Sequence, residues 1–352
     1  MLKILIGKRM IIVTTMSLIV ALVACSQADV GGDLSSATPV AQVVVTLSNK
    51  TATPFLPETN TPIPKPSLTP SHMPTLTLTQ TSTPAPTETI DPLIRFAVIG
   101  DYGLAGQAEA DVAALVLGWS PDFIITTGDN NYPVGSAETI DENIGQYFHQ
   151  FIAPYVGDYG NGADINRFFP TLGNHDWITD EAQPYLDYFS LPGNERYYDF
   201  IWGPVHFFSI NSDSHEPDGF RETSTQAAWL QQNLATSPTP WQIVYTHYPP
   251  YSSGPHGSTT WMQWSFKEWG VDAVLTGHDH VYERLIVDDL VYFVNGLGGG
   301  PRYLFDEPLT WSVVRFRSDY GAMLVEANRA KISFRFFTRA RELIDEYLLI
   351  RR

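Results

Sequence analysis

The chain has a single cysteine, Cys25, among its 352 residues, so no disulfide can form within it. Basic residues are also scarce, since 21 Lys and Arg stand against 38 Asp and Glu, a formal net charge of −17. Nucleic-acid-binding proteins and proteins attracted to anionic lipids need a basic surface, so the composition argues against both classes. An anionic substrate needs a locally positive site in so acidic a protein, and bound metal ions can supply one.

The chain also lacks an apolar run long enough for a comfortable membrane span. The apolar run at the start of the chain, Met10–Ala24, is shorter than the roughly 20 residues that a transmembrane helix needs, and three basic residues precede it. This order is typical of a secretory signal. The ending Leu-Val-Ala-Cys resembles a bacterial lipobox, in which Cys25 is lipidated and becomes the new N-terminus. An ordinary signal or an uncleaved anchor is the alternative. We predict residues 1–25 as a lipoprotein signal peptide and a mature protein outside the cytoplasm, anchored to the bacterial cell membrane or secreted.

Residues 26–92 are rich in Thr, Pro and Ser and show no apolar period. Frequent prolines remove backbone donors and disfavour helices and central strands. We therefore predict a disordered, semi-rigid tether, which at about 3.1 Å per residue in polyproline conformation would reach roughly 200 Å. A single folded domain, residues 93–352, is expected to follow.

The folded region opens with the pattern of a β-α-β unit. Arg95–Gly100 and Phe123–Thr127 are short apolar runs, and the alanine-rich segment Ala108–Leu117 between them is helix-like. This order predicts two parallel strands joined by a right-handed crossover. Five more apolar runs follow, at Arg167–Leu172, Val205–Ile210, Gln242–Thr246, Val271–Thr276 and Leu290–Val294.

Two further segments have a recognisable pattern. Thr225–Leu234 is predicted as a helix with Ser224 as its N-cap. The stretch 312–338 alternates and turns like an antiparallel meander. So many strands favour an α/β domain with two packed sheets over one with a single sheet.

Polar side chains follow five of the apolar runs, at the point where each run ends. In chain order they are Asp101, Asp129, Asn174 with His175, His247, and His278 with His280. Ligands of open α/β sheets bind at the carboxyl ends of the strands. Oxygen and imidazole ligands without a thiolate suit iron, manganese or zinc. The set is too large for one tetrahedral zinc ion, so we predict two metal ions that share a carboxylate.

Five segments in this order, GDYG, GDNNY, GNHD, YTHYP and GHDHVYER, resemble the signature blocks of the calcineurin-like metallophosphoesterases. They resemble in particular the purple acid phosphatase branch, whose second block carries a tyrosine. The resemblance covers about residues 95–347 and implies an α/β fold of two packed mixed β-sheets flanked by helices, a four-layer sandwich. The tether stands where the large plant enzymes have an extra N-terminal β-domain. The chain is therefore similar to the small single-domain form, which includes tartrate-resistant acid phosphatase.

The resemblance also implies a ligand set for each ion. An iron(III) ion would be bound by Asp101, Tyr132, His280 and Asp129. A second divalent ion, iron(II), zinc or manganese, would be bound by Asn174, His247, His278 and the same Asp129. Tyr132 would be a phenolate ligand, and the alternative is a packed turn residue. The three anionic ligands carry less charge than the two ions, and the surplus would hold a hydroxide and attract a phosphate.

Further residues are candidates for acid catalysis or support. The leaving alkoxide needs a proton or a positive partner, and His175 is the first candidate. His256 is the second, because the family has a histidine at this distance after the fourth block; an exposed loop residue is the alternative. Asp176 would either orient His175 or cap a turn. Glu283 and Arg284 match the YER ending of the fifth block and are expected to be supporting residues.

We thus predict an acid phosphatase-like phosphoric ester hydrolase, in which a metal-bound hydroxide attacks phosphate monoesters outside the cell. A phosphodiesterase or nucleotide hydrolase with two divalent metals is the alternative. A non-catalytic surface binding protein is a further alternative. The loss of a candidate ligand would favour it, but all of the candidate ligands are present in the sequence. Small phosphate esters are the expected partners. No nucleic-acid binding is expected, and membrane contact is expected only through the N-terminal lipid anchor.

Overall fold

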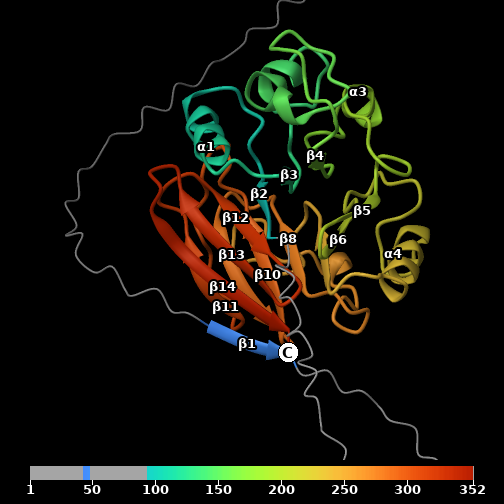
Figure 1. Cartoon of the computed structure of the whole chain (residues 1–352), viewed down its shortest axis with the longest axis vertical. Helices are drawn as coiled ribbons and strands as arrows, with labels where there is room; N and C mark the ends of the chain where they lie inside the picture. Colours follow the sequence, from blue (N-terminus) through green and yellow to red (C-terminus); the bar gives the residue numbers. More distant parts are fainter. Residues whose placement is uncertain (1–42, 48–92, 352) are drawn as a thin grey trace, which may run out of the picture. The chain divides into compact units, whose positions relative to one another are not determined.

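The computed structural model describes residues 43–47 and 93–351 (Figure 1). The predicted signal peptide with Cys25, and the predicted tether other than residues 43–47, lie outside the described residues. Residues 43–47 form the edge strand β1 (Val43–Leu47), which pairs in parallel with the last strand of the chain. The predicted tether thus contains a strand, in a stretch without proline. Within the described ranges, no helix has the length and apolar character needed to cross a membrane.

Two seven-stranded mixed sheets form the centre of the domain (Figure 1). In spatial order, the first sheet contains β1, β14 (Leu343–Arg351), β13 (Lys331–Thr338), β12 (Gly321–Ala327), β2 (Ile94–Ile99), β3 (Phe123–Thr126) and β4 (Phe168–Pro170). The second contains β11 (Ser312–Phe316), β9 (Tyr282–Val287), β10 (Leu290–Asn295), β8 (Ala273–Thr276), β7 (Trp241–Tyr245), β6 (Val205–Ser209) and β5 (Tyr198–Trp202). The predicted fold of two packed mixed sheets flanked by helices is confirmed.

Helical segments lie between the strands. They are α1 (Gln107–Gly118), η1 (Asp141–Gly145), α2 (Gln146–Phe148), η2 (His149–Phe151), η3 (Asp180–Ala182), α3 (Gln183–Tyr188), α4 (Thr225–Ala235) and η4 (Thr260–Met262). The predicted β-α-β unit is confirmed, because β2 and β3 flank α1 and pair in parallel. The predicted N-cap of α4 is also confirmed, since the Ser224 side chain accepts a hydrogen bond from the Ala227 amide at 3.1 Å.

Aromatic side chains fill the space between the two sheets. The Phe207 ring of β6 meets the Phe96 and Phe123 rings of the first sheet at 5.0 and 5.3 Å. The Phe293 ring of β10 lies 5.0 Å from the Phe334 ring of β13. Each fully buried phenylalanine contributes about 1.5–3 kcal/mol relative to an exposed one. This core fixes the two sheets against each other and so places the ends of their strands together.

The predicted meander is correct for β12 and β13, which pair antiparallel, and wrong for β11. β11 joins the second sheet and pairs with β9, while β14 continues the first sheet beside β13. Alternation of apolar and polar residues shows which face of a strand is buried, but it does not identify the partner strand. The structure also adds β5 and β9, which the apolar runs did not predict.

Candidate metal centre

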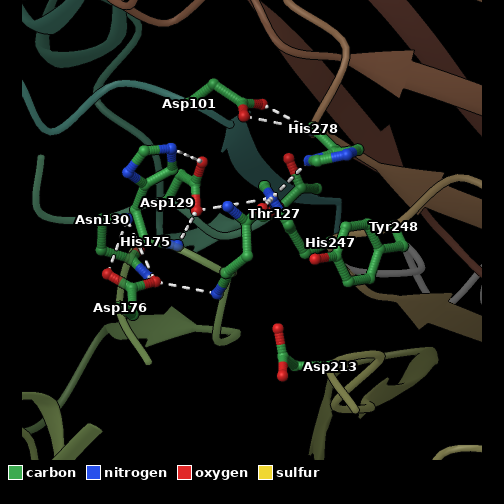
Figure 2. A network of polar contacts seen from close by, with 12 residues as sticks. Asp101, Thr127, Asp129, Asn130, His175, Asp176, Asp213, His247, Tyr248 and His278 are labelled. Atoms are coloured by element: carbon green, nitrogen blue, oxygen red, sulfur yellow. Dashed lines mark hydrogen bonds and ion pairs between the residues drawn. The ribbon is translucent and has the colours of Figure 1, made fainter. Parts of the chain in front are cut away.

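The predicted ligands lie on loops that follow the carboxyl ends of strands from both sheets. Asp101, Asp129 and Asn174 follow β2, β3 and β4 of the first sheet. His247 follows β7 of the second sheet, and the segment with His278 follows β8. Figure 2 shows the side chains of Asp101, Asp129, His247 and His278 gathered in one place. The packing of the two sheets therefore brings together residues that are far apart in the sequence.

The first cluster centres on the hydroxyl of Tyr132. This hydroxyl donates to Asp129 Oδ2 at 2.9 Å and lies 2.9 Å from His280 Nε2 and 3.4 Å from Asp101 Oδ1. His280 Nε2 is also 3.4 Å from Asp101 Oδ1. Asp101, Asp129 and His280 each offer one ligand atom, all within 4.8 Å of one another. These four buried side chains are the ones that the resemblance assigned to a single ion.

The second cluster lies on the other oxygen of the same aspartate. Asp129 Oδ1 is 3.4 Å from His247 Nε2, which is itself 3.0 Å from Asn174 Oδ1. His278 Nδ1 lies 3.2 Å from His247 Nε2. Asp129 thus presents Oδ2 to the first cluster and Oδ1 to the second. This is the position that a carboxylate shared by two metal ions would occupy.

Backbone carbonyls fix the orientation of two imidazoles. His247 Nδ1 lies 2.8 Å from the Thr127 carbonyl oxygen, and His280 Nδ1 lies 2.6 Å from that of Pro301. Each Nδ1–H donates to its carbonyl, which leaves the Nε2 lone pair of each ring facing its cluster. Metal-binding histidines are held in this way, with the other ring nitrogen donating to a carbonyl or carboxylate. The donor set and its orientation therefore fit metal ions.

The loops that carry the ligands have an unusual backbone. Asp101, Asp129 and His278 have φ values of 53°, 53° and 69°, in the left-handed region that residues other than glycine seldom adopt. A Cβ atom on Gly277 would lie 2.5 Å from Asp101 Oδ2, and one on Gly128 would lie 2.6 Å from His247 Nδ1. Strained residues of this kind cluster at functional sites. Glycine before the ligand allows each loop to approach the opposite one.

The charges of the site perturb its titrating groups. Burial lowers the pKa of His247, but the nearby carboxylates, Asp129 and Asp101 first, together with the hydrogen bond to the Thr127 carbonyl raise it by more, so its pKa lies above the usual value. Burial raises the pKa of Tyr132 far above the usual value, and the same two carboxylates add to the effect. Burial and the neighbouring imidazoles lower the pKa of His278. Two buried carboxylates that act on their neighbours in this way indicate a place for cations.

Tyr132 has both features that the sequence left as alternatives. Its ring is 7% exposed and its amide donates to the Gly103 carbonyl at 2.7 Å, as in a packed turn residue. Packing accounts for the buried ring but not for a hydroxyl placed within 3.4 Å of three other candidate ligands. The geometry therefore favours the interpretation of Tyr132 as a ligand.

The two candidate acids lie at the edge of the clusters. His175 Nδ1–H donates to the Pro133 carbonyl at 2.6 Å, and Nε2 lies 4.0 Å from Asp129 Oδ2. The exposed His256 has its ring centre 4.3 Å from that of His278. Both imidazoles are thus placed beside the candidate metal site without belonging to either cluster.

Asp176 braces a turn instead of orienting His175. Its carboxylate accepts hydrogen bonds from the Gly173 amide at 2.8 Å and from the Asn130 side chain at 2.8 Å, and its own amide donates to the Gly173 carbonyl at 3.1 Å (Figure 2). Of the two predicted roles, the structure supports the turn cap. This carboxylate joins the loops after β3 and β4, because Asn130 and Gly173 belong to different loops.

Three residues near the ligands were missed by the sequence reasoning. The Tyr303 ring stacks on His280 at 4.2 Å with an interplanar angle of 6°. The Tyr248 ring lies 4.4 Å from His278, edge-on. Asn130 is fully buried and accepts a hydrogen bond from Thr126 Oγ1 at 2.5 Å. Tyr248 lies in the segment YTHYP and Asn130 in GDNNY, so their position beside a candidate ligand in the sequence could have pointed to them. Tyr303 lies outside all five segments, and no sequence signal marks it.

Comparison with known proteins identifies relatives of several kinds. The chain is 26% identical to purple acid phosphatase 17 of Arabidopsis thaliana, over 59% of this chain and 69% of that protein. It is 25% identical to human tartrate-resistant acid phosphatase type 5, over 59% and 73%. It is 30% identical to an acid phosphatase of Aspergillus ficuum, over 46% of this chain and only 28% of the fungal protein.

Solved structures show the same fold. The purple acid phosphatase PPD1 from yellow lupin, Lupinus luteus, aligns with 74% of this chain and 54% of its own, at 18% identity and a TM-score of 0.61. GAP50, the anchor in the inner membrane complex of Plasmodium, aligns with 73% of this chain and 89% of its own, at 20% identity and a TM-score of 0.57. At these identities the likeness concerns the fold alone.

The model of the calcineurin-like phosphoesterase family matches residues 94–282. This range is more than half of the chain, and it contains every predicted ligand and both candidate acids. The predicted hydrolase class is confirmed at the level of the family and its named acid phosphatase relatives. A chain that matches over this range, with its strand-end side chains gathered around one shared aspartate, belongs to the calcineurin-like phosphoesterase family.

Proposed function

We propose that the protein hydrolyses phosphate monoesters with the help of two metal ions. The observation that carries the proposal is the position of Asp129, whose two oxygens face separate groups of donors. One ion would be held by Asp101, Asp129, Tyr132 and His280. The other would be held by Asp129, Asn174, His247 and His278. Bound there, the ions would supply Lewis acidity and positive charge for the phosphoryl group and its attack by water.

The side chains around the ions have distinct tasks. His175 donates Nδ1–H to the Pro133 carbonyl, so in its protonated form it keeps Nε2–H for the leaving oxygen. Nε2 lies 4.0 Å from Asp129 Oδ2, on the side of the first cluster. His256 reaches the site from the other side, beside His278. No side-chain nucleophile is required, because the ions would supply an activated water as the nucleophile.

The nature of the donors favours particular ions. A phenolate is a hard, anionic oxygen ligand, so Tyr132 would stabilise iron(III) over iron(II). The second group, with an amide oxygen and two imidazoles, suits iron(II), zinc or manganese. We therefore propose iron(III) beside the phenol and a divalent ion in the second group.

We further propose that the enzyme acts outside the cell. The basic and apolar start of the chain and Cys25 support a lipoprotein signal at residues 1–25, and the composition of residues 26–92 supports a tether to the folded domain, residues 93–352. Two or more acyl chains bind a membrane stably, whereas one binds only marginally. The intact mass of protein extracted from membranes tests this, because a lipidated Cys25 at the N-terminus adds a defined mass that a Cys25→Ala variant lacks.

Hydrolysis of two chromogenic substrates tests the proposed reaction. Purified, metal-loaded protein is expected to hydrolyse p-nitrophenyl phosphate faster than bis(p-nitrophenyl) phosphate, and to lose this activity on chelation and in Asp129→Ala. Faster hydrolysis of the diester would instead support the alternative function, a phosphodiesterase with two divalent ions. No turnover of either substrate by fully metallated protein would contradict hydrolysis and favour a binding protein of the same fold.

A further inference from the structure

The loop that carries His256 is fastened to the rest of the site by two consecutive serines. Ser252 and Ser253 begin the sequence SSGPH, and both side chains are 3% exposed. Each hydroxyl meets a different buried carboxylate, and both carboxylates belong to the segment that starts with the ligands His278 and His280. One carboxylate is that of Asp279, and the other is that of Glu283.

Asp279 holds both ends of the short loop. Its Oδ2 accepts a hydrogen bond from the Ser252 hydroxyl at 2.5 Å, and its Oδ1 accepts one from the backbone amide of His256 at 3.0 Å. The Ser252 hydroxyl oxygen also accepts a hydrogen bond from the Gly254 amide at 2.9 Å. A Cβ atom on Gly254 would lie 2.2 Å from the Asp279 carboxyl carbon. The loop therefore passes directly over this carboxylate and takes its shape from it.

Glu283 holds the same loop from the start of β9. Its Oε2 accepts a hydrogen bond from the Ser253 amide at 2.7 Å, and its Oε1 accepts one from the Ser253 hydroxyl at 2.6 Å. The Ser312 hydroxyl also donates to Oε1. The second serine is thus bound through both its backbone and its side chain.

Neither carboxylate forms an ion pair with a lysine or an arginine among the described residues, and both side chains are fully buried. Burying a charge without a counter-ion destabilises a protein unless hydrogen bonds compensate for the lost water. Here neutral hydroxyl and amide donors compensate, and almost all of them come from the loop of His256. Apolar residues of similar volume in place of the two carboxylates would stabilise the fold at least as well. The arrangement instead fixes the path of one loop relative to two ligands.

We propose that Asp279 and Glu283 are positioning residues, which act through Ser252 and Ser253 to hold His256 beside the metal centre. The inference rests on the proposed function, and it assigns a role to the aspartate between the two ligand histidines and to the glutamate that follows them. The loop and the ligands are then a single unit. The imidazole of His256 keeps its place 4.3 Å from that of His278 because the segment with His278 also holds its loop.

Substitution on the loop side tests the proposal, since it leaves the residues next to the ligands unchanged. The full-length, metal-loaded protein is compared with Ser252→Ala, His256→Ala and the double variant, using p-nitrophenyl phosphate and an alkyl phosphate. Ser252→Ala is expected to lower kcat about tenfold, as loss of a hydrogen bond to a charged group does, with unchanged metal content. The loss should be larger for the alkyl ester, whose leaving group needs a proton more. In the His256→Ala background, Ser252→Ala should have no further effect, because it acts through His256.

Ser237→Ala is the matched control. The Ser237 hydroxyl also makes side-chain hydrogen bonds, with His206 and Gln242, but these residues lie at the starts of β6 and β7, away from the strand ends that carry the candidate site. It is expected to keep the wild-type kcat for both esters. Equal losses from Ser252→Ala with and without His256 would overturn the proposal. Crystal structures of the wild type and Ser252→Ala give a readout that does not depend on turnover. Displacement of the His256 ring from His278 supports the proposal, and an unchanged position overturns it, even if the wild type proved inactive and the proposed function failed.

Discussion

Arg284 on β9 and Asp345 on β14 form a buried, two-point ion pair that joins the two sheets. Arg284 Nε and Nη2 donate to the two oxygens of Asp345 at 2.7 and 3.0 Å. The Tyr282 hydroxyl donates to the same carboxylate at 2.8 Å. Arg284 was expected to be a supporting residue of the site, and its support is structural, because it fixes β9 directly after the ligand segment against the first sheet.

Removing one member of this pair should be strongly destabilising. Arg284→Ala leaves the Asp345 carboxylate buried without its counter-ion, and we expect a loss of about 3–5 kcal/mol in the free energy of unfolding. Arg339→Ala is the control, because Arg339 pairs with Asp319 and Asp111 on a partly exposed surface, and each such pair should contribute only about 0–1 kcal/mol. Urea unfolding measures both changes. Equal losses in the two variants would contradict the role given to the buried pair.

A buried acid in α1 should make the stability depend on pH. Glu109 is 1% exposed, and neither of its carboxylate oxygens has a hydrogen-bond partner in the described part of the chain. Burial raises its pKa well above the usual value, by more than the nearby Leu104 amide lowers it. The folded state therefore holds a proton that the unfolded state releases above a pKa of about 4.3, and stability falls as the pH rises from there.

Glu109→Gln should remove this loss. We expect the variant to be more stable than the wild type at pH 7 and the difference to disappear near pH 4, whereas Glu307→Gln, at an exposed position, should follow the wild type. Urea unfolding at a series of pH values gives the comparison. A constant difference between Glu109→Gln and the wild type across the series would mean that Glu109 does not bind an extra proton in the folded state.

Metal binding should stabilise the fold, because the candidate ligands lie on loops that follow strands of both sheets. An ion that binds only the native state adds about 2.7 kcal/mol at a concentration 100 times its Kd. We expect the Tm of chelator-treated protein to rise when iron, zinc or manganese is added, and not to rise in Asp129→Asn. Differential scanning calorimetry measures this. A Tm that rises equally in both proteins would place the ion elsewhere.

His175 should affect the chemical step but not the binding of metal. It lies outside both clusters, so His175→Asn should keep its metal content while kcat for p-nitrophenyl phosphate and alkyl phosphates falls about 10²- to 10⁴-fold, most for the alkyl esters. His206→Asn is the matched control, since this histidine bonds to Asp199 and Ser237, away from the ligands. Steady-state rates with metal analysis on the same samples give the test. Wild-type rates in His175→Asn would exclude it as the acid.

Much of the site could be predicted because its signals are local. A polar residue at the end of each of five apolar runs marks the loops, and a glycine precedes it in four of the five. The order of these ends predicted the candidate ligands before their distances were known. The contacts between the loops could not be predicted in the same way. The His278 amide donates to Asp101, 177 positions away, and nothing in either segment specifies the other.

The sheet partners show the same limit. Alternation predicted a strand at β11 but not its sheet, and β1 lies in a composition that favours an extended tether. Asp279 lies within the segment GHDHVYER, but the sequence assigns it no role, because its partners Ser252 and His256 belong to a different loop. Long-range pairing is decided by the packing of the two sheets, which a local pattern does not contain.

The central claim is that one carboxylate, Asp129, is shared by two metal ions and that a phenol, Tyr132, binds one of them. Elemental analysis and the visible absorption spectrum, measured together on wild type, Tyr132→Phe and Asp129→Ala, test it most directly. The account predicts two ions per wild-type chain, a visible charge-transfer band that disappears in Tyr132→Phe, and loss of both ions in Asp129→Ala. A colourless, active wild type with two divalent ions would contradict the iron(III)–phenolate site, and an Asp129→Ala variant that keeps both ions would contradict the shared carboxylate.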